Sequence, residues 1–194
     1  MSAMTESMPP VLKPMAGSFD ADLAATLIQT RQQFAPKRLH APGPDEAQIR
    51  AHFQAAAAAP DHGQILPWRF VVVPAQRRAA LGEVFAAALR ERDPATSECE
   101  VTEAREGGDD HPEIPSKERL ISLGCAIQNM LLCAHADGFG SGLVSGQAFQ
   151  TVGMRQLLAL RDNERAVCFV AAGTAQRRKP VRPRPSPEDF VTQL

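Results

Sequence analysis

The stretch Pro60-Asp61-His62-Gly63-Gln64-Ile65-Leu66-Pro67-Trp68-Arg69-Phe70-Val71-Val72-Val73 joins an Ala-rich helical segment to an apolar run. Pro60 ends the helix, because proline lacks an amide hydrogen and disfavours the helical conformation of the residue before it. Residues 70–73 are uncharged, mostly β-branched and followed by Pro74, which predicts a short buried strand. A polar loop beside apolar segments is a common place for a site, although this pattern alone favours an ordinary helix-to-strand connection.

The composition is that of an ordinary globular protein, with 194 residues, 44% hydrophobic and 22% charged residues, and a net charge of −1. This length predicts a single domain over residues 19–194, after a disordered tail over residues 1–18. The near-neutral charge argues against nucleic-acid or membrane-surface partners, and no apolar run is long enough to span a membrane. The four cysteines match neither a metal site nor a disulfide framework, so we expect reduced thiols in a cytoplasmic protein.

The spacing of apolar residues predicts the remaining elements. Helices are expected from Asp20 or Asp22 to about Arg31, from Pro44 through residue 57, and over residues 75–92, 116–138 and 151–160. The helix over 116–138 is the most apolar and is expected at the centre, and residues 167–172 are expected to form a buried strand. His52, on the second helix, is expected at its surface or boundary.

Three further segments are ambiguous. The glycine-rich residues 140–146 suit a flexible turn or close approach to a ligand, but their spacing does not fit a dinucleotide-binding fingerprint. Residues 93–112 are acidic and predict a mobile loop without metal-ligand spacing. The cations of residues 177–184 lie on a proline-rich segment, which suits either phosphate binding or a solvated basic tail, and the pattern alone favours the tail.

Taken in order, these segments resemble the nitroreductase-like flavoproteins, and most closely a small subgroup whose loop reads A-P-D-H-G before P-W-R-F, here residues 59–63 and 67–70. The subgroup's cationic loop, T-R then K-R-L then P-G-P, matches residues 30–44. Further matches are His-Pro-Glu-Ile-Pro at 111–115, Gly-Phe-Gly at 138–140 and the closing Arg-Pro-Arg-Pro at 182–185.

The resemblance implies an α+β fold with a mixed, mostly antiparallel sheet flanked by helices, in an intertwined homodimer with FMN at the interface. It implies an enzyme that takes hydride from NAD(P)H and passes it through FMN to a nitroaromatic, quinone or similar small acceptor. Because the flavin carries this chemistry, we expect no catalytic side chain and no metal.

The resemblance also implies roles for the site residues. Cations for the FMN phosphate are expected from Arg31, Arg182 and Arg184. Donors to the edge of the isoalloxazine ring are expected from Gln32, Gln33 and Lys37. Close contacts with the ring face are expected from Pro60, Asp61 and His62 of the partner chain, and from Leu143, Val144, Ser145 and Gly146.

Three features depart from the family pattern. Gln32-Gln33 replaces the usual Arg-Ser, and Gly142-Leu143 stands where the subgroup often has a polar residue and Trp. Relatives carry an apolar central strand where this chain has only the acidic residues 93–110, so either a strand is lost or the sequence omits residues. We favour omission, because a missing central strand would leave backbone groups unpaired inside the sheet.

Two other classes of function remain. A flavin-binding module without reductase turnover fits the substituted loop residues. A nucleic-acid binder that uses the cations of residues 177–184 would show steeply salt-dependent binding, and the net charge argues against it.

Overall fold

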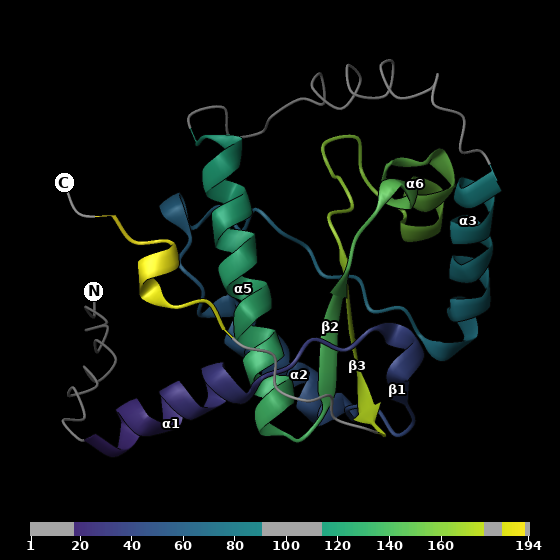
Figure 1. Ribbon diagram of the computed structural model, residues 1–194. Helices are drawn as coiled ribbons and strands as arrows, with labels where there is room; N and C mark the ends of the chain where they lie inside the picture. Colours follow the sequence, from purple (N-terminus) through teal and green to yellow (C-terminus); the bar gives the residue numbers. More distant parts are fainter. Residues whose placement is uncertain (1–17, 91–113, 177–183, 193–194) are drawn as a thin grey trace, which may run out of the picture.

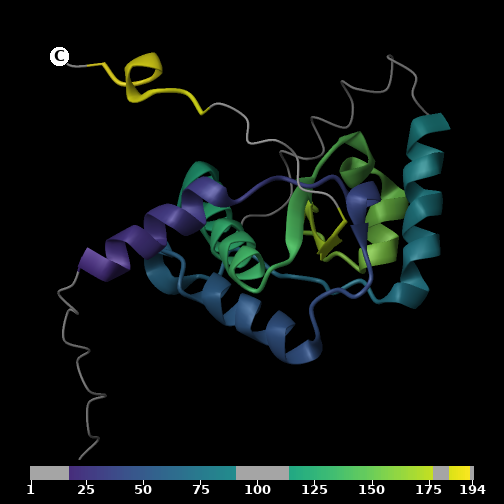
Figure 2. The same cartoon turned by 60° about the horizontal axis from the view of Figure 1, so that its bottom comes forward.

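The computed structural model describes residues 18–90, 114–176 and 184–192. A three-stranded antiparallel sheet of order β1-β3-β2 lies between helices α1, α2 and α5 on one side and α3 and α6 on the other (Figures 1 and 2), which confirms the α+β prediction. The described elements are α1 (Ser18–Thr30), η1 (Pro36–Arg38), β1 (Leu39–His40), α2 (Glu46–Ala57), η2 (His62–Gln64), η3 (Ala75–Arg77), α3 (Arg78–Arg90), α5 (Ser116–Ala136), β2 (Gly140–Val144), η5 (Gln147–Gln150), α6 (Val152–Leu158), β3 (Phe169–Ala175) and η6 (Pro187–Asp189).

The five predicted helices are present, and local chemistry fixes their ends. Asp45 caps α2: its side chain accepts from the amide of Gln48 at 2.8 Å, and the Gln48 side chain accepts from the amide of Asp45 at 3.0 Å. At the C-terminal end of α5, Gly138 adopts a left-handed φ of +87°. The Phe139 amide then donates to the Ala134 carbonyl at 2.9 Å, which closes the last turn of the helix.

The sheet is short, and its longest described strand is β3. β2 pairs with β3 along its whole length, from Gly140 opposite Gly173 to Val144 opposite Phe169. On the other edge, β1 contributes only Leu39 and His40. β3 confirms the strand predicted near residues 167–172. Of the two alternatives left open for residues 140–146, the flexible turn is wrong over the length of β2.

Two apolar clusters form the core. The first lies between α2 and α5, where the small side chains of Ala56 and Ala126 are almost fully buried. The second lies between α3 and α6, around Met154, which is fully buried. The segment from Trp68 to Val73 joins the clusters, because Trp68 packs on the first and Val73 on the second.

The strand predicted over residues 70–73 is wrong: this segment is extended, but no described strand pairs with it. β-branched side chains favour a strand only where a neighbouring strand supplies the ladder of hydrogen bonds. Val71 and Val72 are accordingly exposed.

The expectation of a surface or boundary position for His52 is also wrong. Its side chain is only 6% exposed, and Nε2 lies 2.8 Å from Oδ2 of Asp137 at the end of α5. The partner is 85 residues away in the sequence, so the spacing within α2 gives no sign of it.

The predicted tail lies outside the described residues except for Ser18, which opens α1, and the predicted acidic loop over residues 93–112 lies outside them entirely. Within the described ranges, no helix combines the length and apolar character needed to cross a bilayer.

Candidate functional site

The loop after α1 lies directly on β2. The Phe34 amide donates to the Ser141 carbonyl at 2.9 Å, and Gln33 donates from Nε2 to the Leu143 carbonyl at 2.9 Å. Glycine permits this approach, because a Cβ on Gly142 would lie 2.1 Å from the Phe34 carbonyl oxygen. Gly142 therefore accommodates the chain's own backbone, and this contact brings two predicted parts of the site, residues 31–33 and 143–144, together.

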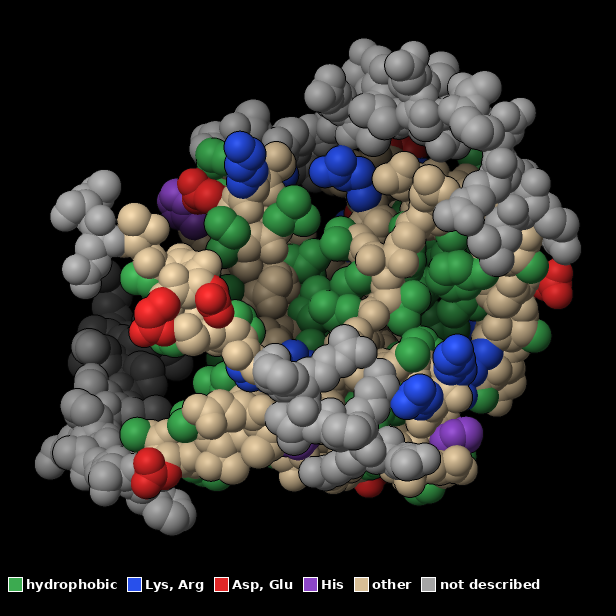
Figure 3. Space-filling model, in the orientation of Figure 1, with side chains coloured by type: hydrophobic (Ala, Val, Ile, Leu, Met, Phe, Trp, Pro, Cys, Tyr) green, Lys and Arg blue, Asp and Glu red, His purple; other side chains and the backbone are tan. Residues whose placement is uncertain are grey.

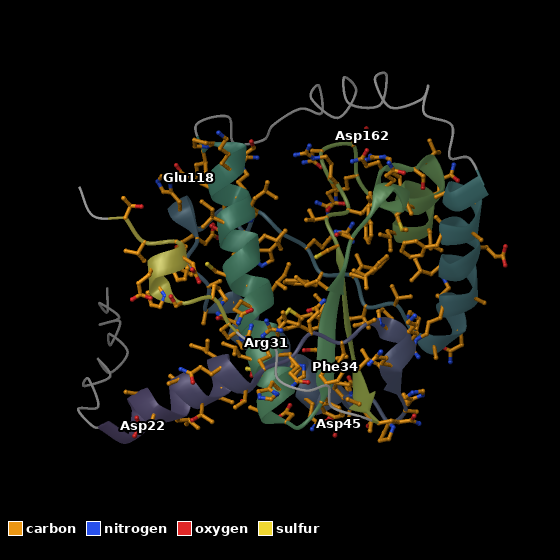
Figure 4. All side chains as sticks on the ribbon, viewed as in Figure 1. Asp22, Arg31, Phe34, Asp45, Glu118 and Asp162 are labelled. Atoms are coloured by element: carbon orange, nitrogen blue, oxygen red, sulfur yellow. The ribbon has the colours of Figure 1, made fainter. Side chains whose placement is uncertain are left out.

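Arg31 follows the last residue of α1, and Figure 4 labels it near the end of α5. Its Nη1 is buried and has no hydrogen-bond partner among the described residues. Burial, and then the nearby charge of Arg184, lower the pKa of the Arg31 guanidinium. Arg184 itself donates to the Arg31 carbonyl at 3.0 Å. Two neighbouring guanidinium groups, one with a buried N–H that has no acceptor among the described residues, are suited to an anion with several acceptor oxygens.

Gln32 follows Arg31 in the chain and lines a small pocket where α1 meets the end of α5. Thr30 Oγ1 donates to the Thr26 carbonyl at 2.7 Å, so it must accept from Nε2–H of His135, 2.8 Å away. The bond fixes the ring tautomer and holds α1 against α5. The residues that line this shallow pocket are Thr30, Gln32, Phe34, His135, Phe139, Gly140 and Ala175.

The predicted loop after α2 is tightly folded. Asp61 accepts from the Leu66 amide at 2.8 Å, and Gln64 and Leu66 both adopt positive φ, +51° and +48°. Such conformations are costly for residues with side chains, and they persist where the surroundings hold them. His62 supplies one anchor, because its Nδ1 lies 2.7 Å from Oε2 of Glu118 in the first turn of α5.

The two predicted halves of the site lie at opposite ends of α5. His62 contacts Glu118 near the start of the helix, whereas Thr30, next to Arg31, contacts His135 in its last turn. At 1.5 Å of rise per residue, these contacts are about 25 Å apart along the helix. Figure 4 shows Glu118 and Arg31 near opposite ends of α5. Within one chain, the structure therefore does not bring residues 60–62 to Arg31.

The remaining predicted residues are dispersed. Lys37 lies on η1 and is exposed, while Ser145 and Gly146 are exposed just after β2. Arg182 lies outside the described residues. Sequence reasoning missed Glu118, because its contact with His62 joins residues 56 apart with no shared motif.

No group of three or more His, Cys, Asp or Glu side chains in the described part of the chain is arranged to hold a metal.

The fold agrees with what the chain resembles among known proteins. The nitroreductase family model matches residues 36–104 and 99–174. A Haemophilus influenzae protein named "Putative NAD(P)H nitroreductase" is 30% identical over 186 residues, covering 88% of this chain and 99% of that protein. The Escherichia coli K12 protein of the same name, YdjA, is 29% identical over 184 residues, covering 88% and 98%.

Solved structures show the same fold. The nitroreductase-like family protein from Bacillus cereus superposes with a TM-score of 0.69 at 14% identity, covering 97% of this chain and 99% of that one. The FMN-dependent nitroreductase NfnB from Mycobacterium smegmatis, solved in complex with NADPH, gives 0.66 at 16% identity, covering 90% and 99%. The chain belongs to the nitroreductase family, a family of oxidoreductases, as its sequence motifs predicted.

Proposed function

We propose that this protein is an FMN-dependent NAD(P)H oxidoreductase whose acceptor is a nitroaromatic, a quinone or a similar small molecule. The observation that carries the proposal is the buried Nη1 of Arg31, which lies near Arg184 and has no hydrogen-bond partner in the part of the chain that the structure describes. A buried guanidinium N–H without an acceptor is unfavourable, and a phosphate group would satisfy it. The names of the relatives point to the same cofactor and electron donor.

The residues of this cluster fit the phosphate end of FMN. Arg31 and Arg184 would hold the phosphate, with Arg182 as a further cation. Gln32 and Lys37 remain candidates for the ring edge, whereas the Gln33 amide already donates to Leu143. Bound FMN supplies the chemistry by accepting hydride from NAD(P)H and releasing it to the acceptor. The chain's own residues bind and orient, and we assign no catalytic side chain to hydride transfer.

The second half of the site belongs, in this proposal, to the partner chain of a homodimer. On α5, the side chains of Leu120 (52% exposed) and Ile121 (67% exposed) face solvent in one chain. Figure 3 shows further exposed apolar side chains along α5 and beside the sheet. A two-fold axis across this face would set two α5 helices antiparallel. The partner's loop of residues 60–62, at the start of its α5, would then approach Arg31 near the end of the first α5.

We also infer that residues are omitted from the sequence near the acidic stretch, where the family resemblance implies a central strand. An alignment of 186 residues that uses 88% of a 194-residue chain includes positions present only in the relative. The family match divides within residues 99–104, and Val71 and Val72 are exposed on an extended segment with no described strand beside it. The intact mass of the protein from its native cells tests omission, which predicts more than 20.9 kDa.

The rival function is a flavin-binding module without turnover. The visible absorption spectrum of the purified protein, followed by anaerobic addition of NADPH or NADH, separates the two. We expect a flavin spectrum that bleaches. A spectrum that does not bleach would favour the binding module, and the absence of flavin after incubation with excess FMN would contradict both.

We also place the protein in the cytoplasm, with Cys125, Cys133 and Cys168 as free thiols.

A further inference from the structure

His62 and Glu118 form an oriented pair at the start of α5. Glu118 Oε2 lies 2.7 Å from Nδ1 of His62, so the imidazole donates Nδ1–H to the carboxylate. Among the described residues, Nε2 of His62 has no partner, and the side chain is 69% exposed in this chain. The pair therefore holds the ring with Nε2 directed away from Glu118.

This arrangement suits proton donation from Nε2. Histidine is the side chain that serves most often as a general acid, and a ring held at Nδ1 by a carboxylate presents its other nitrogen to a bound molecule. Three other groups bear on the charge of the ring. Glu118 is in direct contact, while Asp61 and Arg119 share its shallow pocket. Asp61 accepts from the Leu66 amide, and Arg119 donates to the Ile114 carbonyl at 2.9 Å. Glu118 is thus the described charge bonded to the imidazole.

We propose that His62 delivers a proton to the acceptor at the partner's flavin site, and that Glu118 is its positioning residue. The inference rests on the proposed function, because the acceptor must bind where the loop meets the partner. A quinone that receives a hydride still needs one proton to become a hydroquinone. The His62 imidazolium gives this proton from Nε2, becomes neutral while its Nδ1–H stays bonded to the Glu118 carboxylate, and regains a proton from water.

The test compares two acceptors that differ in their need for a proton. 1,4-Benzoquinone takes up protons on reduction, whereas ferricyanide accepts single electrons and takes up none. We expect His62→Gln to slow reduction of the quinone about tenfold, less than general acids often contribute because water reaches this exposed site. Glu118→Gln should slow it in the same direction. The rate of quinone reduction relative to that of ferricyanide reduction should therefore fall in both variants.

The pH profile and the ring tautomer give independent readouts. The pH profile of quinone reduction by the wild type should contain a step that is absent from the profile of His62→Gln and from ferricyanide reduction by the wild type. Nitrogen-15 NMR of histidine-labelled protein should show His62 as the Nδ1–H tautomer, and Glu118→Ala should remove that preference. His40→Gln and Glu83→Gln, at exposed positions on β1 and α3, are the matched controls.

The outcomes separate the two proposals. An unchanged quinone rate and pH profile in His62→Gln, or an equal loss with ferricyanide, would overturn the proton-donor role while leaving the reductase intact. A wild type that binds no flavin or is not reduced by NAD(P)H would overturn the proposed function and this inference with it. Unfolding temperatures of all variants distinguish loss of the proton donor from loss of the fold.

Discussion

Arg69 and Glu164 form a two-pronged ion pair that ties the central stretch of the sequence to the turn after α6. Arg69 donates from Nε to Oε1 at 2.7 Å and from Nη2 to Oε2 at 2.6 Å. Glu164 also accepts from the Arg161 amide at 2.8 Å, and its carbonyl accepts from Arg155 at 2.9 Å. One carboxylate thus fixes both the segment that joins the two cores and the turn that precedes β3.

This pair predicts an acid-sensitive contribution to stability. The hydrogen bonds from Arg69, more than any other cause, lower the pKa of Glu164 to about 2. Because the folded pKa lies below the ordinary value of about 4.3, the contribution is complete above that value and is lost as the pH falls towards 2. We expect Glu164→Gln to lower the free energy of unfolding at pH 7 by about 1 kcal/mol, since the pair is partly exposed and screened.

Urea unfolding of the wild type and Glu164→Gln at several pH values checks this prediction. The difference between the two proteins should shrink steadily between about pH 4.3 and pH 2. Glu83→Gln, on the exposed face of α3, should match the wild type throughout. A difference that stays constant with pH would mean that Glu164 acts by packing and not by charge.

The helices could be predicted from the sequence because their signals are local. Apolar spacing and capping residues such as Asp45 and Gly138 act within a few positions of the helix they define. β2 was missed because its glycines are needed for contact with Phe34, a residue far away in the sequence. The strand predicted over residues 70–73 is wrong for the complementary reason. A strand forms only beside a neighbouring strand, and the sequence of residues 70–73 alone does not show whether one is present.

The candidate site shows the same division. Motif resemblance identified Arg31, Gln33, Leu143 and Arg184, which the fold does bring close to one another. It could not reveal that the Gln33 amide is already used on the Leu143 carbonyl, 110 residues away. Nor could it reveal that Glu118 holds His62, because no short-range pattern encodes a contact between a loop and a distant helix.

Gly142→Ala should destabilise the protein. The added Cβ would lie 2.1 Å from the Phe34 carbonyl oxygen, so the two backbones must separate. We expect a loss of about 2–3 kcal/mol in the free energy of unfolding, as for other overpacked sites. Gly82→Ala is the matched control: nothing lies within 4 Å of its Cβ, and alanine favours the interior of α3. Urea unfolding should show opposite signs for the two variants.

His52→Ala should also destabilise the protein, because it removes a buried ring and its bond to Asp137 at 2.8 Å. The cavity and the unpaired carboxylate together predict a loss of about 2–3 kcal/mol. His40→Ala, which removes an exposed ring on β1, should change the free energy of unfolding little. Equal effects for the two substitutions in thermal unfolding would contradict the structural role of the His52–Asp137 pair.

Arg31→Ala should weaken FMN binding without weakening the apo protein. Losing charge-assisted bonds to a phosphate costs about 1.5–3 kcal/mol, which corresponds to about ten- to a hundredfold in Kd. Because the buried Nη1 has no partner among the described residues, its removal should leave the unfolding temperature of the apo protein unchanged or higher. Flavin fluorescence titration measures the first effect and calorimetry the second.

The control for this prediction is Arg78→Ala, which removes an exposed cation at the start of α3. It should leave FMN affinity unchanged. Arg31→Lys keeps the charge but loses the planar fork, so its affinity should fall between wild type and Arg31→Ala. Equal affinity in wild type and Arg31→Ala would rule out the phosphate role.

Ile121→Arg should separate the homodimer and release FMN together. Ile121 is 67% exposed on α5, so a substitution there should scarcely alter the fold of one chain, but it would bury a charge at the proposed two-fold interface. Val152→Arg is the control, because Val152 is equally exposed (69%) but lies on α6, across the sheet from α5. Light scattering gives the mass, and absorbance gives the flavin content. Coupled loss of both in Ile121→Arg alone is expected, since His62 and Arg31 lie at opposite ends of α5 and meet only between chains. A variant that becomes monomeric yet keeps its FMN would show that one chain completes the site unaided.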